Sequence, residues 1–161
     1  MILKQGEMIA TIKSIPWFHD LSLENIQRLL TIAEIRSIET DEVIFAEGEQ
    51  NAFLFVILEG TIQIESYVPG YGQLPIYIAE PLDVIGWSSF SLVIRQNPSC
   101  ARALEKSNLL AFHTKKLQKF CEINHDLGFT IMQRMVNIVA SCMLNHHLKL
   151  LSLLSGDNLK S

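Results

Sequence analysis

The middle of the chain alternates apolar and polar residues, whereas both ends repeat apolar residues at the spacing of a helix. Behind Ser22, leucine, isoleucine and alanine recur every three or four positions, which predicts a short capped helix at about residues 22–32. Residues 1–13 are expected to form an arm or a further helix. From Ile35 onward the period changes to two, and glycine and proline interrupt runs of β-branched residues. The pattern predicts a β domain preceded by a helical segment.

The clearest pair of strands lies at residues 53–64, where alternate apolar residues flank a tight turn at Glu59-Gly60. The turn sequence PGYGQ separates this pair from a further strand at 74–81, and a last strand is expected at 109–113. Short strands joined by glycine and proline turns are typical of a sandwich, a roll or a barrel.

Beyond the last strand the helical period returns, which predicts a short helix at 114–124 and a long helix at 125–154. Residues 155–161 are expected to form a disordered tail. The long helix carries two apolar stripes. The first stripe comprises Leu127, Ile131, Met135, Ile138 and Cys142. The second stripe comprises Phe129, Met132, Val136, Val139 and Met143.

One stripe can pack on the β domain, but the other needs a partner, because large exposed apolar patches are rare on monomers. We therefore expect a homodimer formed through the long helix, and another protein is a further candidate partner. The residues assigned to the dimer interface are Ile131, Met135, Ile138 and Cys142.

Composition narrows the class of protein. The chain has 161 residues, of which 48% are hydrophobic and 19% are charged, so a compact fold is expected, with the β domain and its N-terminal helical segment at 1–124. The net charge of -4 gives no basic surplus, and nucleic acid is not an expected partner. The three cysteines are widely spaced, which predicts buried thiols. No signal peptide and no apolar window of about 18 residues is evident, so we expect a cytoplasmic protein without a membrane partner.

Four segments carry a resemblance to a known family. They are IPWFHDLSLENIQRLLTIAEIRSIETDEVIFAEGE, NAFLFVILEGTIQI, VIGWSS and CARALEKSNLLAFHTKKLQKFCEINHDLGFTIMQRM. In order and spacing, over about residues 15–150, they resemble the cyclic-nucleotide-binding domain family, the sensor domain of catabolite-activator-type regulators. The resemblance implies an eight-stranded cupin-like β-roll, which is a jelly roll or double-stranded β-helix, with an N-terminal helix and a long C-terminal helix.

In this family the nucleotide lies inside the roll, where a glutamate holds the ribose 2′-hydroxyl and an arginine pairs with the phosphate. The resemblance places Trp87 at the glutamate position and Ser99 at the arginine position. An indole cannot accept a hydrogen bond from the ribose, and a serine has no charge for the phosphate. Each lost charge-assisted contact costs about 1.5–3 kcal/mol, so standard binding of cyclic AMP is not expected.

The residues expected to bind a ligand in this region are Gly86, Trp87, Ser88, Ser89, Arg95, Ser99, Cys100 and Arg102. Ser88 and Ser89 are expected to cap the short helix that follows the glycine turn. The strand period places Ser99 on one face and Cys100 with Arg102 on the other, so Arg102 faces outward if Ser99 faces inward. Trp87 either stacks on a ligand ring or fills the pocket.

We expect a non-catalytic sensor or regulatory module that takes a small anionic or nucleotide ligand in a non-standard mode. The alternative is a ligand-free dimeric interaction module whose pocket is filled by Trp87. A cupin-type metal enzyme needs converging histidines, but only His113 lies on a predicted strand, and His146 and His147 are expected to be solvated. No metal, other cofactor or enzyme activity is therefore expected. The chain ends about seven residues after the long helix, so no DNA-binding helix-turn-helix is expected.

Overall fold

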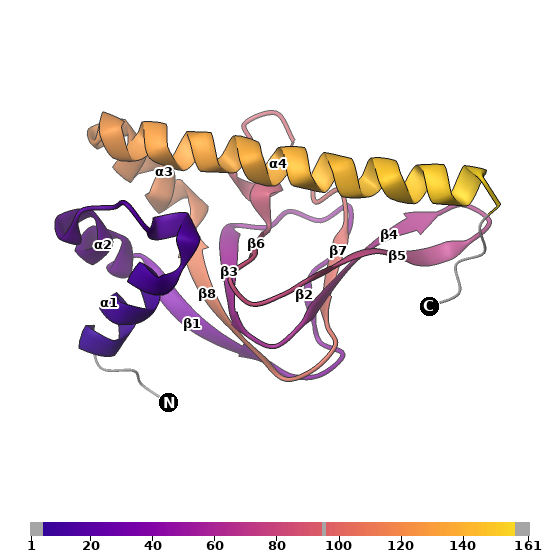
Figure 1. Ribbon diagram of the computed structural model, residues 1–161, viewed down its shortest axis with the longest axis horizontal. Helices are drawn as coiled ribbons and strands as arrows, with labels where there is room; N and C mark the ends of the chain where they lie inside the picture. Colours follow the sequence, from indigo (N-terminus) through magenta and orange to yellow (C-terminus); the bar gives the residue numbers. More distant parts are fainter. Residues whose placement is uncertain (1–4, 95, 157–161) are drawn as a thin grey trace.

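The computed structural model describes residues 5–94 and 96–156, which form two β-sheets flanked by helices (Figure 1). The strands are β1 (Ala33–Ile38), β2 (Val43–Phe45), β3 (Phe53–Glu59), β4 (Ile62–Val68), β5 (Gly72–Ala79), β6 (Val84–Ile85), β7 (Cys100–Ala103) and β8 (Ser107–His113). The helices are α1 (Gln5–Ser14), α2 (Leu23–Leu30), α3 (Thr114–Ile123) and α4 (His125–Leu154), with 3-10 helices η1 (Pro16–Phe18) and η2 (Trp87–Phe90).

The eight strands form two antiparallel sheets that face each other. The first sheet has the order β1-β8-β3-β6 and the second has the order β2-β7-β4-β5. Aliphatic side chains such as Ile57, Ile62 and Leu109 fill the space between them. The predicted turn between β3 and β4 is confirmed, and Gly60 adopts a φ of 89° that favours glycine. The expected mainly β roll with flanking helices is therefore confirmed.

The N-terminal helices cover the outer face of the first sheet. Because side chains alternate along β3, Leu54 and Val56 face these helices while their neighbours face the roll interior. The ring of Phe18 lies against that of Phe112 at a centroid distance of 5.4 Å. The predicted cap is confirmed, since the Ser22 hydroxyl accepts a hydrogen bond from the backbone N–H of Asn25 at 3.2 Å.

The long helix α4 has the predicted bounds, and α3 ends at Ile123, one residue before the predicted end. Asn124 separates them, and its side chain caps α4 by accepting a hydrogen bond from the backbone N–H of Leu127 at 3.0 Å. Figure 1 shows α4 running along the whole molecule, above the N-terminal helices, across the roll and beside the β4–β5 hairpin. The expected tail beyond Gly156 lies outside the described residues.

The first apolar stripe of α4 packs inside the protomer. Ile131 is fully buried, Met135 and Cys142 are buried, and Ile138 packs against the same core. The assignment of these four residues to a dimer interface is therefore wrong, because the chain's own sheets and helices already cover them. The second stripe is the exposed one: Phe129, Val136 and Met143 are 72%, 65% and 73% exposed.

By length and composition α4 could cross a membrane, which the sequence analysis did not predict. An 18-residue window of this helix has a mean hydropathy of 1.4, and 28% of the window is buried within the protomer. A core helix that packs one face on a β-roll can have the same length and hydropathy as a membrane-spanning helix. The first stripe of α4 packs on the domain core in that way.

Candidate functional site

The glycine turn predicted before η2 is present. Gly86 is buried and has a φ of 80°, and a Cβ atom added there would lie 2.8 Å from the carbonyl oxygen of Phe53. The backbone therefore passes too close to β3 for any side chain. This contact fixes where η2 starts at the end of the roll.

The two serines of η2 hold neighbouring segments and do not cap the helix. Gly86 is the cap residue, and η2 has no side-chain cap, so the expectation that Ser88 and Ser89 cap it is wrong. The Ser88 hydroxyl donates to the side-chain oxygen of Asn97 at 3.0 Å. The Ser89 hydroxyl shares its one proton between the carbonyl oxygens of Gly86 at 2.7 Å and Phe53 at 3.0 Å, and it lies 2.9 Å from the Thr114 hydroxyl. Both hydroxyls are thus engaged within the protein.

Trp87 contacts α4 at the mouth of the roll. Its indole N–H donates a hydrogen bond to the sulfur of Cys142, and the hydroxyl of Tyr77 lies 3.4 Å from the same sulfur. Burial raises the pKa of the Cys142 thiol, and burial together with this neighbour raises the pKa of Tyr77 well above its usual range. Both groups therefore stay neutral near pH 7. The sulfur of Cys142 on α4 contacts Tyr77 of β5 and Trp87 of η2.

Ser99 joins the roll interior to α4 through a chain of hydrogen bonds. The Ser66 hydroxyl donates to the Ser99 oxygen at 3.1 Å, and Ser99 lies 3.3 Å from Nε2 of His146. Nδ1 of His146 lies 2.8 Å from the carbonyl oxygen of Cys142. Because a carbonyl only accepts, Nδ1 of the neutral ring carries the proton, which leaves Nε2 to accept from Ser99. The expectation that His146 is solvated is therefore wrong.

These side chains leave almost no space where the family's ligand would lie. The remaining cavity has a volume of about 20 Å³ and is lined by Trp87, Ser88, Ser99, Cys142 and His146, with Tyr77 and Phe45. That volume admits about one water molecule. A small-molecule site normally offers about 300–1,000 Å³.

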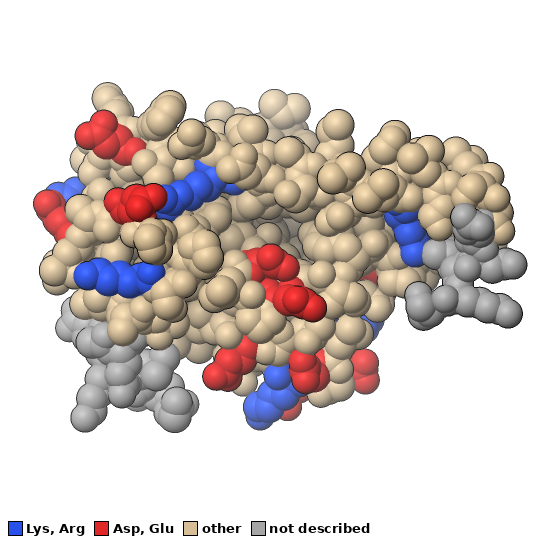
Figure 2. Space-filling view, in the orientation of Figure 1, with Lys and Arg blue, Asp and Glu red and all other residues tan. Residues whose placement is uncertain are grey.

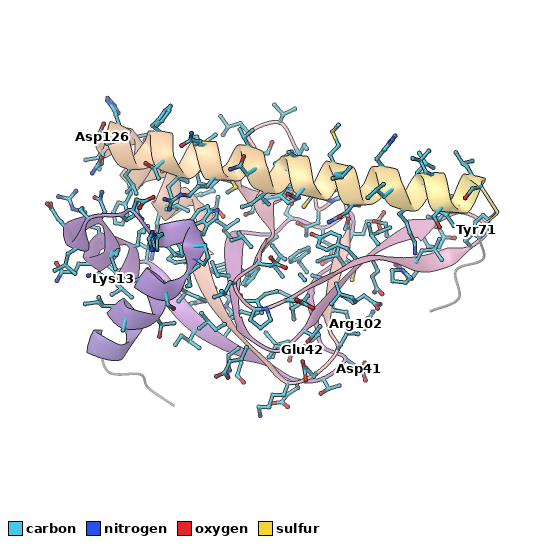
Figure 3. The ribbon with its side chains drawn as sticks, in the orientation of Figure 1. Lys13, Asp41, Glu42, Tyr71, Arg102 and Asp126 are labelled. Atoms are coloured by element: carbon cyan, nitrogen blue, oxygen red, sulfur yellow. The ribbon has the colours of Figure 1, made fainter. Side chains whose placement is uncertain are left out.

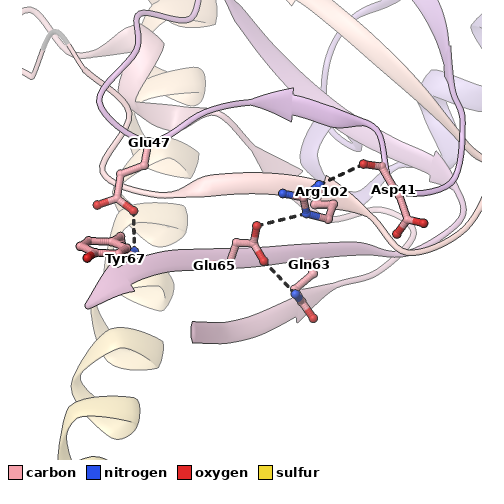
Figure 4. A network of polar contacts seen from close by, with 6 residues as sticks. All are labelled: Asp41, Glu47, Gln63, Glu65, Tyr67 and Arg102. Carbon is pink, nitrogen blue, oxygen red and sulfur yellow. Dashed lines mark hydrogen bonds and ion pairs between the residues drawn. The ribbon is translucent and has the colours of Figure 1, made fainter. Parts of the chain in front are cut away.

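Cys100 and Arg102 do not line this cavity, because both lie on the outer face of the second sheet. Arg102 Nε is 3.2 Å from the carboxylate of Glu65, and its Nη1 donates to the backbone oxygen of Asp41 at 3.1 Å (Figure 4). Figure 3 shows Arg102 and Asp41 on the side of the roll far from α4. The expectation that Cys100 and Arg102 bind an interior ligand is therefore wrong, whereas the predicted division of the strand faces is confirmed.

The outer-face cluster has a structural explanation. Glu65 is buried, and its second oxygen accepts a hydrogen bond from the side chain of Gln63 at 3.0 Å. Burial, followed by the nearby Glu65 carboxylate, raises the pKa of the Cys100 thiol, which keeps it protonated and poorly nucleophilic. Arg95, the remaining predicted ligand residue, lies outside the described residues.

Sequence reasoning missed three residues that shape the interior: Ser66, Tyr77 and His146. Ser66 and Tyr77 lie on strands whose inward face was predicted to be apolar, so their polar groups gave no local signal. His146 lies one helical turn beyond Cys142, and that spacing on the buried stripe could have indicated it. Within the described residues, no group of three or more His, Cys, Asp or Glu side chains could hold a metal ion.

The comparisons with known proteins agree with this architecture. The sequence profile of the family described as "Cyclic nucleotide-binding domain" matches residues 35–124, more than half of the chain. The chain therefore belongs to the cyclic nucleotide-binding domain family. No curated protein sequence matches it significantly.

Several solved structures share the fold at low sequence identity. A cyclic nucleotide-binding domain from Methylobacillus flagellatus KT is 17% identical with a TM-score of 0.76, covering 97% of this chain and 85% of that one. The sensor domain of the transcriptional regulator DNR from Pseudomonas aeruginosa is 16% identical with a TM-score of 0.73, covering 86% and 93%. The catabolite activator protein of Thermus thermophilus is 20% identical with a TM-score of 0.69, covering 85% and 63%. At these identities the similarity shows the fold alone.

Proposed function

We propose that this chain is a non-catalytic, homodimeric regulatory module whose interior pocket is filled by its own side chains, so that it does not bind a cyclic nucleotide in the standard mode. The observation that carries this proposal is the interior cavity of about 20 Å³, closed by Trp87, Tyr77, Cys142 and His146. Between the two functions expected from the sequence, this favours the interaction module over the sensor of a small anionic ligand.

The polar groups of the interior also support the proposal. The hydroxyl of Ser99 and the ring of His146 hydrogen-bond each other, and the indole of Trp87 is paired with Cys142. A nucleotide would have to break these contacts and displace α4 before it gained any of its own. The resemblance also assigns no glutamate and no arginine to the two recognition positions.

A thermal-unfolding titration with cyclic AMP and cyclic GMP tests the filled pocket. A ligand present at a thousand times its dissociation constant adds about 4 kcal/mol to the free energy of unfolding, which raises the melting temperature by several degrees. We expect no change with either nucleotide at millimolar concentration. A saturable increase that disappears in Ser99→Ala would contradict the proposal and favour the sensor function.

The homodimer rests on the second stripe of α4. Its apolar residues follow one another at spacings of three and four, as in a coiled-coil seam, and they are exposed on a helix with only three charged residues: Asp126, Arg134 and Lys149. Beside this stripe, Trp87 and Phe90 of η2 line an apolar groove of about 530 Å³. A second copy packed along the stripe would cover the helix face and this groove together.

Light scattering after gel filtration tests the homodimer. Wild type is expected to be a dimer, and Val136→Asp is expected to be a monomer because a charge would be buried in the interface. Gln133→Asp is the matched control, since it adds the same charge to an exposed position of α4 outside the stripe. A monomeric wild type, or two variants that both remain dimers, would contradict this part of the proposal.

A further inference from the structure

A second groove lies between α4 and the edges of both sheets, and Tyr77 and Cys142 separate it from the interior cavity, which they also line. It has a volume of about 660 Å³, and its walls are α4 on one side and residues of β5 and β6 on the other. Figure 2 shows the surface hollowed below α4, with acidic side chains at its lower rim. This groove is more than thirty times larger than the interior cavity, and none of the second-stripe residues lines it.

The helix wall of this groove carries a ladder of polar side chains. Asn137, Ser141 and Asn145 line it at intervals of four residues, and within the described residues none of these side chains has a hydrogen-bond partner. Four helical residues rise by about 6 Å. Two residues of an extended chain rise by about 6.6 Å, so the ladder nearly matches the backbone repeat of an extended peptide.

The chemistry of the ladder fits the same ligand. The NH2 group of a carboxamide side chain can donate to the C=O of a peptide unit, and its oxygen can accept from a peptide N–H. Two asparagines separated by two helical turns can therefore each bind a peptide unit, with Ser141 between them. A free nucleotide would require an unpaired positive charge, and a metal ion would require clustered carboxylates. The only arginine among the residues that line the groove, Arg134, already donates to the Trp17 carbonyl oxygen.

The opposite wall offers backbone groups. β5 is the edge strand of the second sheet and pairs only with β4, and Tyr77, Ile78 and Ala79 at its C-terminal end line the groove. These three residues pair regularly with Ile64, Gln63 and Ile62 of β4, beyond the irregularity near Pro75. An edge strand leaves alternate N–H and C=O groups open to a further strand.

The rim of the groove sets the charge of the ligand. Asp83 lines the groove and is exposed, and one of its carboxylate oxygens accepts a hydrogen bond from the backbone N–H of Glu80 at 2.9 Å. Its charge is not balanced by any described Lys or Arg within 4.0 Å, whereas Arg134, which also lines the groove, lies 3.8 Å from the Asp20 carboxylate. The free charge of the groove is therefore negative and attracts a basic side chain.

From these observations we infer that the groove binds an extended, basic segment of a partner protein, which adds as a strand to the edge of β5 while the Asn137–Ser141–Asn145 ladder holds its other side. The site lies on the flank of α4 opposite the second stripe, so a dimer can bind two such segments. The inference does not depend on the proposed dimer or on the filled pocket.

The probe is a display library of random dodecapeptides selected on the purified protein. Enriched peptides are then synthesised with a fluorescent label, and their dissociation constants are measured by anisotropy. We expect enriched peptides to contain lysine or arginine and to bind at least tenfold more weakly to Ser141→Trp, which fills the groove from an exposed position. Gln133→Trp, on the same helix but outside the groove, is expected to bind as wild type.

Two further readouts identify the mode of binding. Asp83→Asn is expected to weaken binding about fivefold and to reduce its dependence on salt. In NMR spectra, the amide signals of Tyr77, Ile78 and Ala79 are expected to shift and to exchange more slowly when the peptide binds. The inference is overturned if no peptide is enriched, if Ser141→Trp binds as wild type, or if binding is lost only in Val136→Asp, which would place the peptide on the second stripe.

Discussion

Trp87 is the residue on which the proposal of a filled interior depends most. Its indole lies between the interior cavity and the apolar groove beside α4, and it lines both. The indole has no acceptor for a ribose hydroxyl, and its N–H donates to the sulfur of Cys142. Trp87 thus links the glycine turn to the long helix.

Replacing Trp87 tests whether the side chain fills the interior. Trp87→Ala is expected to lower the free energy of unfolding by about 2–4 kcal/mol, because a large half-buried aromatic is lost and a cavity remains. Trp87→Phe keeps most of the volume and loses the hydrogen bond to Cys142, so about 1 kcal/mol is expected. Urea denaturation measures both. A cost below about 0.5 kcal/mol for Trp87→Ala would show that the indole does not fill the site.

Gly86 can be tested against a matched glycine. Gly86→Ala combines a φ of 80° with a Cβ placed 2.8 Å from the Phe53 carbonyl oxygen, so a loss of about 2 kcal/mol or more is expected. Gly70→Ala shares a φ of 85° but has open space around the new Cβ, and about 1 kcal/mol is expected. Equal losses in the two variants, measured by thermal unfolding, would mean that close approach to β3 is unimportant.

At the scale of elements, the position of α4 on the roll is the central feature. Cys142 and His146 are one helical turn apart, and together they connect α4 to β4, β5, the glycine turn and the segment before β7. A ligand can change the position of such a helix only by binding one position more tightly than another. Here the chain's own side chains make these contacts, so we expect α4 to keep this position without a ligand.

This arrangement predicts that stability falls in alkaline solution. The pKa values of Cys142 and Tyr77 are raised in the folded protein, so the folded state keeps protons that the unfolded chain releases above about pH 8.5 and pH 10, respectively. Their contribution is fully present below those values and is lost as the pH rises. The thiols of Cys100 and Cys121 act in the same direction.

Urea denaturation between pH 7 and pH 11 checks the sign of this effect. Each group that stays protonated only in the folded state contributes a slope of at most about 1.4 kcal/mol per pH unit. Tyr77→Phe is the control and is expected to flatten the curve above pH 10. A free energy of unfolding that stays constant or rises across this range contradicts the role given to these groups.

The elements could be predicted well from the sequence, because their signals are local. The bounds of α4, the Ser22 cap and the Glu59-Gly60 turn all follow from spacing and residue type within a few positions. The choice between the two stripes of α4 could not be predicted in this way, because both are apolar at the same spacing. Only the position of the sheets decides which stripe is buried.

At the scale of the whole molecule, the fold could be predicted from local signals, whereas the site could not, because it depends on contacts between distant segments. The order of segments was sufficient to indicate the family, and the roll followed from it. The filled interior depends on contacts between residues far apart in the chain, such as Ser66 with Ser99 and Tyr77 with Cys142. The direction of Arg102 was predictable from the strand period, but its partner Glu65 was not, because that pairing crosses from β7 to β4.

The whole molecule is therefore described as a roll that holds its long helix without a ligand and presents that helix to partners. In this proposal the second stripe is the dimer surface, and the groove beside β5 is the surface for a basic segment of a partner protein. These two surfaces lie on different flanks of α4, so both can be occupied at once while its first stripe stays packed on the domain core.

Hydrogen exchange of the backbone amides, measured with and without millimolar cyclic AMP, tests the central claim most directly. If the chain's own side chains fill the interior and hold α4, exchange in β6, η2 and α4 will be the same in both samples. Slower exchange in the glycine turn and α4 when the nucleotide is added would contradict the claim, because it would show that a ligand enters the roll and positions the helix.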